Sequence, residues 1–426
     1  MMVKFHRLLC AGTLCIGMTA SLSALAADDN SHLTGDWNGT RRALSDAGVD
    51  LSLGYLSESA TNISGGDHNE GAYADEFELG LGLDLDKLLS WSGASVRVLV
   101  TDRNGNNLND KADLGALMQF QEIYGRGSVT RWTMLYLEQK LLDDKLDIKL
   151  GRLPMNIDIA NYGCDFINLS FCGGLPGYLV STWYNYPVSQ WGGRIRYDFD
   201  SGWYAMVSAT QVNPRYLENG QSMNVGSPSG TIGGLYVAEF GSSMRLGASN
   251  LPGSFFVGLW RDTADSSDQL LDVNGEPQAL TGEPAKQHDG NSGLYFNIQQ
   301  QITSVDGSPK RGMSLFVNFV QADSATSYVD QLLSIGMRYA GPFAARPDDA
   351  LGFVVGRTRV SSSAAAAQHI AGGEAPGSEY PSELYYRAKV LPWLNLEPSL
   401  QYIYKPGGVS SNDNLLIGTL RVAVDF

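Results

Sequence analysis

The sequence predicts an all-β protein: a transmembrane antiparallel β-barrel of about sixteen strands, preceded by a short N-terminal periplasmic helix. Three observations support this fold class. The chain begins with an export signal, its segments alternate between apolar and polar residues, and its connections alternate between long and short. Outer-membrane barrels combine long outer loops with short periplasmic turns, whereas a soluble β-sandwich has no reason to place every long loop at one end.

Residues 1–26 have the features of a secretory signal peptide. Lys4 and Arg7 give a positive start, residues 8–25 are apolar or small, and Ala24-Leu25-Ala26 matches a cleavage site. We expect cleavage after Ala26. No stop-transfer pattern follows, so this segment is expected to be removed rather than to anchor the chain.

A helix is predicted between Ser31 and Gly48, within an N-terminal periplasmic segment that covers residues 27–48. Asp36 is a suitable N-cap, and Gly48 suits the position that follows the C-cap. An apolar stripe on one face supports the helix, and it consists of Trp37, Leu44 and Ala47. The barrel domain is expected to cover residues 49–426.

The composition fits a barrel with one face in lipid and one in water. Apolar residues make up 43% of the chain, and its 49 Gly and 20 Tyr suit tight turns and interfacial aromatic belts. No run of about 18 apolar residues follows the signal, so no transmembrane helix is expected. The formal charge of −15 becomes −17 when Lys4 and Arg7 leave with the signal, which excludes a general nucleic-acid-binding protein.

After the helix, segments with period-two alternation follow one another to the end of the chain. Such alternation is typical of strands that lie between lipid and water. The predicted strands are 49–57, 76–86, 94–102, 131–141, 145–151, 190–199, 202–211, 231–240, 252–261, 291–301, 312–321, 332–340, 350–359, 382–390, 394–404 and 416–425. In the last one, the even positions from Leu420 to Phe426 are apolar. We interpret it as the closing strand of the barrel, and the last strand of a periplasmic sandwich is the alternative.

The connections between these strands fall into two classes. The long ones, expected on the outer side, are 58–75, 103–130, 152–189, 212–230, 262–290, 322–331, 360–381 and 405–415. The tight links include 142–144, 200–201 and 391–393, while those at 241–251, 302–311 and 341–349 are longer than ideal. An even strand count places both termini in the periplasm, and about sixteen strands are enough to leave an aqueous channel.

If the apolar residues face lipid, the residues of opposite parity face the lumen. A charge on the lipid face costs about 2–4 kcal/mol at mid-bilayer, so charged residues within the strands are expected to face the lumen. The predicted lumenal residues are rich in arginine, with carboxylates and amides between them. They are Arg97, Thr101, Tyr136, Glu138, Lys140, Gln190, Arg194, Arg196, Arg338, Glu383, Tyr385, Arg387, Lys389, Asn395, Glu397, Gln401 and Arg421. Such a lining suits either anions or sugar hydroxyls.

The longest outer connection, 152–189, contains a cysteine pair. Cys164 and Cys172 are the cysteines that remain after signal removal, and a close pair in an exported protein favours a disulfide. The bridge adds about 2–3 kcal/mol in the chain-entropy model. A metal site is the alternative, but no His or third Cys lies near in the sequence, and no metal is expected. We expect this stapled apolar loop to fold inward and narrow the pore; a rigid external knob is the alternative.

Catalytic sequence patterns are absent. The histidines of the mature chain lie outside the predicted strands and beside no serine motif; they are His32, His68, His288 and His369. Motifs of the types G-x-S-x-G and H-E-x-x-H and phosphate-binding loops do not occur. We therefore expect no enzyme and no cofactor. The acidic stretch 262–272 is interpreted as a solvated loop, with a calcium site as the alternative.

Several motifs resemble the carbohydrate-selective porins of the OprB family. The segment from Asp36-Trp37-Asn38-Gly39 to Ala47-Gly48-Val49 is similar to the opening motif of that family, with Asn38 in place of the usual glycine. Further similar motifs are YLEQ at 136–139, GRLP at 151–154, CDFIN at 164–168, FCG at 171–173 and YPVSQWG at 186–192. The resemblance covers residues 33–426, and the order and spacing of the motifs are its strongest part.

The resemblance implies a bacterial outer-membrane channel, surrounded by lipid, for the passive diffusion of glucose or related sugars. It also implies a sugar site at a constriction, built from charged residues of the early strands. By matching motif, the candidate residues are Arg97 and Glu138, then Arg152, Asp165 and Trp191. Parity adds Arg194 and Arg196 to these candidates and places Trp191 toward lipid.

Competing functions stay open at the level of sequence. A general or anion-selective porin without a sugar site is the main alternative, and an outer-membrane enzyme or an adhesin barrel are others. The sequence does not set the preferred sugar. It also leaves the oligomeric state open between a monomer and a homo-oligomer, because a contact between barrels resembles any other lipid-facing strand.

Overall fold

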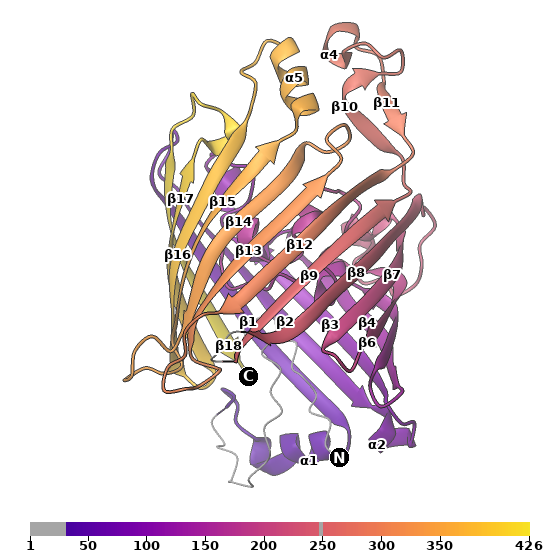
Figure 1. Cartoon of the computed structure of the whole chain (residues 1–426), viewed down its shortest axis with the longest axis vertical. Coiled ribbons are helices and arrows are strands. Elements are labelled where there is room, and N and C mark those ends of the chain that lie inside the picture. The colour runs from indigo at the N-terminus through magenta and orange to yellow at the C-terminus, as the bar shows by residue number, and fades with distance from the viewer. Residues whose placement is uncertain (1–30, 247–249) are drawn as a thin grey trace.

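A computed structural model describes residues 31–246 and 250–426; the predicted signal peptide 1–26 lies outside these residues. Within them, sixteen strands form a closed antiparallel barrel, in which the last strand pairs with the first (Figure 1). The strands of the wall are β1 (Val49–Ser64), β2 (Gly71–Asp84), β3 (Ala94–Gly105), β4 (Val129–Leu141), β5 (Leu146–Leu153), β6 (Gln190–Asp198), β7 (Trp203–Val212), β8 (Gly233–Leu246), β9 (Leu251–Asp262), β12 (Asn291–Gln301), β13 (Gly312–Ala322), β14 (Val329–Ala340), β15 (Ala350–Val360), β16 (Ser378–Leu391), β17 (Leu394–Tyr404) and β18 (Leu415–Asp425). This confirms the predicted fold class. Among the described helices, none has the length and apolar character needed to cross a membrane.

The outer side of the barrel carries structure that the sequence analysis did not predict. Strands β10 (Ser266–Asp272) and β11 (Ala285–His288) form a hairpin inside the predicted loop 262–290. It stands beyond the rim together with the short helices α4 (Gln278–Thr281) and α5 (Ser362–Ile370) (Figure 1). The acidic stretch there is thus largely a folded hairpin rather than a solvated loop, and Asp268 Oδ2 lies 2.8 Å from His288 Nε2.

The N-terminal helix is shorter than predicted. Helix α1 covers Thr40–Asp46, after a 3-10 turn η1 (Trp37–Gly39), and Gly39 rather than Asp36 is its N-cap. Trp37 and Asn38 both have positive φ angles, so an α-helix does not continue through them. Gly48 follows the C-cap with a φ of 94°, as predicted. The helix lies at the same end of the barrel as the C-terminus (Figure 1).

The short turns share that end, which places the long connections at the other rim. Helix α2 (Leu85–Leu89) fills the turn between β2 and β3 and is capped by the Asp84 side chain. The link between the N-terminal segment and the barrel is direct, because Arg41 Nη2 donates to Phe426 O at 2.7 Å. Both ends of the described chain therefore lie at the periplasmic rim, as the even strand count predicts.

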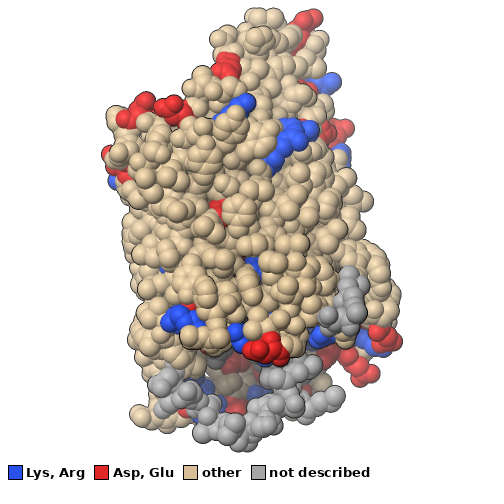
Figure 2. Space-filling model, turned by 60° about the vertical axis from the view of Figure 1, so that its left-hand side comes forward, with Lys and Arg blue, Asp and Glu red and all other residues tan. Residues whose placement is uncertain are grey.

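The outward face of the wall is apolar, as the parity argument predicts. The most exposed outward side chains are aliphatic, and they include Leu79, Leu150, Val207, Leu259 and Ile335. On the side shown in Figure 2, Lys, Arg, Asp and Glu gather toward the two rims, and few of them appear in the broad band between. The polar residues of opposite parity, among them Glu58, Arg194 and Glu397, are buried inside.

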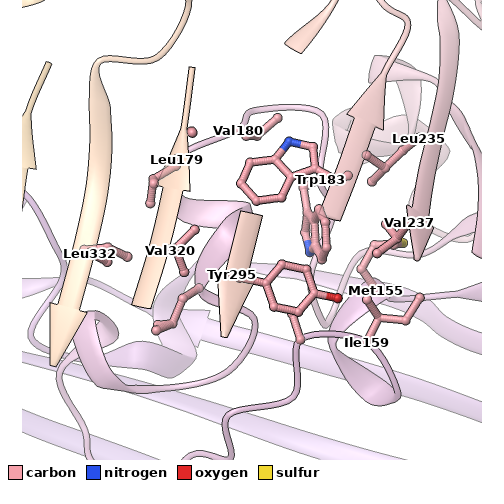
Figure 3. Packing of buried hydrophobic residues seen from close by; sticks show 14 of the residues in the cluster. Met155, Ile159, Leu179, Val180, Trp183, Leu235, Val237, Tyr295, Val320 and Leu332 are labelled. Atoms are coloured by element: carbon pink, nitrogen blue, oxygen red, sulfur yellow. The ribbon is translucent and has the colours of Figure 1, made fainter. Parts of the chain in front are cut away.

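Loops narrow the lumen from the inside. In segment 106–128, Leu108 and Phe120 are fully buried and pack against the inner faces of β1, β17 and β18. Segment 154–189 packs against the opposite wall, where Trp183 meets Tyr295 of β12 with ring centroids 6.1 Å apart (Figure 3). This second segment is the predicted stapled loop, and it lies inside the barrel rather than forming an external knob.

Candidate functional site

A polar cavity of about 410 Å³ lies in the lumen between the inward loop 154–189 and the wall. Its lining comes from the loop and from the wall strands β6 to β9 and β12 to β16. The charged and aromatic residues among them include Asp158, Asp165, Arg196, Tyr204, Glu239, Arg338, Tyr385 and Arg387. Ligand sites of this kind combine a few convergent polar groups with aromatic walls, and the volume falls within the usual range of about 300–1,000 Å³.

Asp165 is the carboxylate at the centre of the strongest cluster. It lies between two arginines, 2.6 Å from Arg338 Nε and 3.1 Å from Arg387 Nη1. Arg387 also pairs with Glu397 of β17. Because each ion has a partner of opposite charge, the cluster presents fixed donors and acceptors to the cavity.

The fold of the loop places Asp165 there. Cys164 and Cys172 are joined by the predicted disulfide. Next to it, Glu383 of β16 accepts hydrogen bonds from the backbone N–H groups of Ile167 and Asn168, at 2.9 and 2.8 Å. Phe166 is fully buried and packs on Tyr385, with ring centroids 5.0 Å apart. The wall therefore holds the backbone and the neighbouring ring on either side of the carboxylate.

A second ionic cluster surrounds Asp158 of the same loop. Its carboxylate lies 2.9 Å from Lys149 Nζ and 3.2 Å from Arg194 Nε. Burial acts to raise the pKa of Asp158, but the two cations outweigh it and lower that pKa to about 2. Arg194 also pairs with Asp147 at 3.0 Å, and Lys149 lies 3.8 Å from Glu138.

Glu239 of β8 provides a third fixed carboxylate. It accepts hydrogen bonds from Ala160 N at 2.9 Å, from Tyr204 Oη at 2.8 Å and from Tyr295 Oη at 2.7 Å. The Arg196 guanidinium lies 3.9 Å from the Tyr204 ring centroid and pairs with Asp198. These bonds fix the loop backbone at Ala160 to the far wall of the cavity.

Three arginines near the outer side have no carboxylate partner among the residues that the structure describes. Arg131 donates to Tyr216 O at 2.8 Å and to Arg126 O at 3.3 Å. Arg152 donates to Ser189 and to Asn224 O and lies 4.3 Å from the Tyr216 ring centroid. Arg126 lies 5.9 Å from the Tyr184 ring centroid. Neutral groups surround these charges in the described part of the chain: backbone oxygens, the Ser189 hydroxyl and tyrosine ring faces.

The structure distributes the candidate residues from the sequence over three places. Asp165 and Arg196 line the cavity, and Arg194 and Glu138 connect to it through Lys149 and Asp158. Arg97 lies across Gly80 and Gly82 of β2 on the inner face, and it forms no ion pair within 31–246 and 250–426. Arg152 and Trp191 both bond to the connection that follows β7; Trp191 Nε1 donates to Gly226 O at 3.1 Å.

Sequence reasoning missed Asp158, Glu239 and the amides Asn297 and Gln299 of β12. Asp158 lies in a loop, where alternation says nothing about direction. Strand β8 has apolar residues on both faces, since Leu235 and Val237 point inward against the loop, so parity could not separate lipid from lumen there (Figure 3). The sequence did contain a signal for Glu239. A carboxylate in a strand of apolar residues is tolerated only where it faces away from lipid and has a polar partner, so Glu239 could have been assigned to the lumen.

Comparison with known proteins shows which proteins this chain resembles. A family model described as the carbohydrate-selective porin, OprB family, matches residues 68–426. Porin B of Pseudomonas aeruginosa is 38% identical over 436 residues, which covers 97% of this chain and 96% of that protein. The putative porin QuiX of Acinetobacter baylyi is 30% identical over 446 residues, covering 97% and 98%. A solved structure of Pseudomonas putida OprB at high pH has a TM-score of 0.90 and 38% identity, covering 94% of this chain and 99% of that chain.

Proposed function

The chain belongs to the OprB family of carbohydrate-selective porins and forms an outer-membrane channel for carbohydrates, and on this premise we propose that glucose-like monosaccharides bind in the lumenal cavity beside Asp165. Diffusion through such a channel is passive and needs neither a cofactor nor a catalytic residue. The proposal therefore concerns only how the lumen recognises its substrate.

The placement of Asp165 between Arg338 and Arg387 carries the proposal. A sugar hydroxyl both donates and accepts hydrogen bonds, so it suits a site where carboxylates accept and guanidinium groups donate side by side. The amides of Asn297 and Gln299 line the same cavity. Substrate bound there displaces water from groups that are already oriented, which favours selectivity without tight binding.

The remaining candidates take different roles in this proposal. Arg97 and Glu138 contact the sugar on its way to the cavity, on the β3–β4 side of the lumen. Both side chains point inward, and Arg97 forms no ion pair in the described part of the chain. Arg194 and Arg196 fix Asp158 and Tyr204 at the cavity. Arg152 and Trp191 hold the connection after β7 in place rather than contacting the sugar.

One observation favours a second function, an anion-selective pore without a sugar site. Arg126, Arg131 and Arg152 present positive charge with no carboxylate partner in the described part of the chain. Such a group raises the local concentration of anions. The two functions differ in an observable way, because a sugar site saturates with a neutral sugar and an arginine lining does not.

Planar bilayers containing the purified protein test the proposal. Glucose is titrated while ion current is recorded, and inorganic phosphate is titrated in a second series. We expect glucose to reduce the current saturably. Arg338→Gln, Arg97→Ala and Glu138→Ala should each raise the half-blocking glucose concentration by about five- to tenfold, since each removes about one hydrogen bond of about 1–1.5 kcal/mol. Asp413→Asn, in an exposed outer loop, is the matched control and should leave the block unchanged.

Either result of this experiment is decisive. A current that glucose leaves unchanged, together with strong block by phosphate, would support the anion-selective pore instead. Saturable block by glucose that Arg338→Gln does not alter, while Arg97→Ala does, would move the site from the cavity to the β3–β4 side.

A further inference from the structure

The lipid-facing wall contains a groove of about 880 Å³ across β5 to β9. Small residues from three neighbouring strands form its floor, namely Gly193 of β6, Ala209 of β7 and Ala238 of β8. Larger aliphatic and aromatic side chains form its sides, and they are Ile148, Leu150, Ile195, Val207, Tyr236 and Leu259. The register places these residues next to one another, because Gly193 pairs with Ala209 and Val207 pairs with Ala238.

The groove crosses the wall obliquely: Ile148 and Ile195, on β5 and β6, lie near the short turns, and its other end reaches the outer part of β7 to β9. Ala209, Tyr236 and Leu259 are all near the ends of their strands that are remote from the short turns, and Figure 1 shows these strands side by side along the barrel. A recess in a lipid-facing wall is filled by hydrocarbon, because an empty apolar space loses dispersion contacts on every side. An occupant that enters at the outer end, beside Tyr236 and Leu259, comes from the outer leaflet.

Arg261 makes the outer end of the groove cationic. It lies directly opposite Tyr236 in the register and has the same outward parity as Leu259. Its side chain is exposed and donates to the backbone oxygen of Asp289, and it forms no ion pair with any residue in the described ranges. A cation on the lipid side of a barrel is costly at mid-bilayer but not at the interface, where an anionic headgroup attracts it.

We propose that this groove binds a phosphorylated glycolipid of the outer leaflet, of the lipid A class. One acyl chain lies along the floor formed by Gly193, Ala209 and Ala238, and Arg261 binds a phosphate of the headgroup. The Tyr236 hydroxyl lies beside it at the interface, where tyrosine is favoured. The combination of an apolar groove for a chain and a cation at its outer end matches one amphipathic molecule better than a second protein surface, which needs neither.

Native mass spectrometry of the full-length folded protein in detergent tests this inference. The probes are purified bis-phosphorylated lipid A, the same lipid without phosphates, and phosphatidylglycerol. We expect one lipid A per chain, and a loss of affinity of about fivefold in Arg261→Gln, since one interfacial cation contributes about 1 kcal/mol. Ala209→Phe fills the floor of the groove with an outward side chain and should abolish the adduct.

Arg245→Gln is the matched control, because Arg245 is also exposed and donates to a backbone oxygen, at the opposite end of β8. A single-channel conductance equal to that of the wild type shows that each variant is folded. Equal binding by Arg261→Gln and Arg245→Gln would overturn the proposal, and so would phosphatidylglycerol binding as tightly as lipid A. A dimer that Ala209→Phe dissociates would identify the groove as a contact between two copies and would also overturn it.

Discussion

Arg421 on the last strand and Glu58 on the first strand form an ion pair of 2.7 Å across the seam that closes the barrel. The two residues are directly opposite in the register of β1 and β18, and both are buried. Arg421 also reaches Glu122 of segment 106–128 at 3.1 Å and Glu397 of β17 at 3.3 Å. One side chain thus connects the two ends of the wall with an inward loop.

Arg421→Met should destabilise the barrel by about 3–5 kcal/mol, because it leaves the buried carboxylates of Glu58 and Glu397 without their cation. Urea unfolding in lipid vesicles, followed by tryptophan fluorescence, measures this loss. Arg357→Gln is the control, since Arg357 donates to Ser378 and forms no ion pair in the described part of the chain. A midpoint for Arg421→Met that equals the control would contradict the role of the seam.

The strands of the wall were predictable from sequence, because lipid on one face and water on the other select apolar and polar side chains at alternate positions. Arg421 lies between Leu420 and Val422, and only one parity keeps it away from lipid. The same rule fails where a loop covers the inner face. Tyr295 and Val237 point inward yet are apolar, because they pack on segment 154–189 instead of facing water.

Parts of the site depend on contacts that sequence spacing does not encode. The motif around Cys164 indicated a stapled loop and drew attention to Asp165. Its partners Arg338 and Arg387 come from strands far along the chain. Alternation predicted that both face the lumen, but not that both pair with Asp165. The hairpin of β10 and β11 was missed because its acidic residues resemble those of a loop.

Replacing both Cys164 and Cys172 by alanine should cost about 2–3 kcal/mol, the loop-closure entropy of a short bridge. The barrel should still form, because the loop keeps the backbone bonds to Glu383 and the buried Phe166 ring. We expect a lower urea midpoint with unchanged far-ultraviolet circular dichroism. The wild type under reducing conditions provides the comparison. A variant that no longer folds would show that the bridge does more than shorten the unfolded loop.

Asp158→Asn should reduce stability at pH 7 by about 2 kcal/mol, as expected for a carboxyl whose pKa falls from 3.8 to about 2 on folding. Because the folded-state pKa is the lower one, this contribution is complete above pH 4. It is lost as the pH falls from about 4 to about 2. Urea midpoints of wild type and variant should therefore converge over that interval. Asp143→Asn, which removes an exposed carboxylate from a short turn, is the control and should leave the urea midpoint at pH 7 close to that of the wild type.

Asp165→Asn should shift the channel toward anions. Arg338 and Arg387 lose the carboxylate that they share, so net positive charge at the cavity rises by one. Reversal potentials in a salt gradient measure the change in selectivity, and we expect the glucose block to weaken at the same time. Asp413→Asn removes an equal charge from an exposed outer loop and serves as the control. Equal reversal potentials for the two variants would show that Asp165 lies off the ion path.

Glu383→Ala should loosen the inward loop and widen the pore. The Glu383 carboxylate accepts hydrogen bonds from the N–H groups of Ile167 and Asn168 and from Ser399 Oγ at 2.8 Å. Its removal leaves buried donors unsatisfied at about 1–3 kcal/mol each, which the loop avoids by moving away from β16. We expect higher single-channel conductance and weaker glucose block, whereas Glu374→Ala, which loses bonds to Ser410 and Ser411 in an outer loop, should change neither. Wild-type conductance in Glu383→Ala would mean that the disulfide and the Phe166 ring hold the loop on their own.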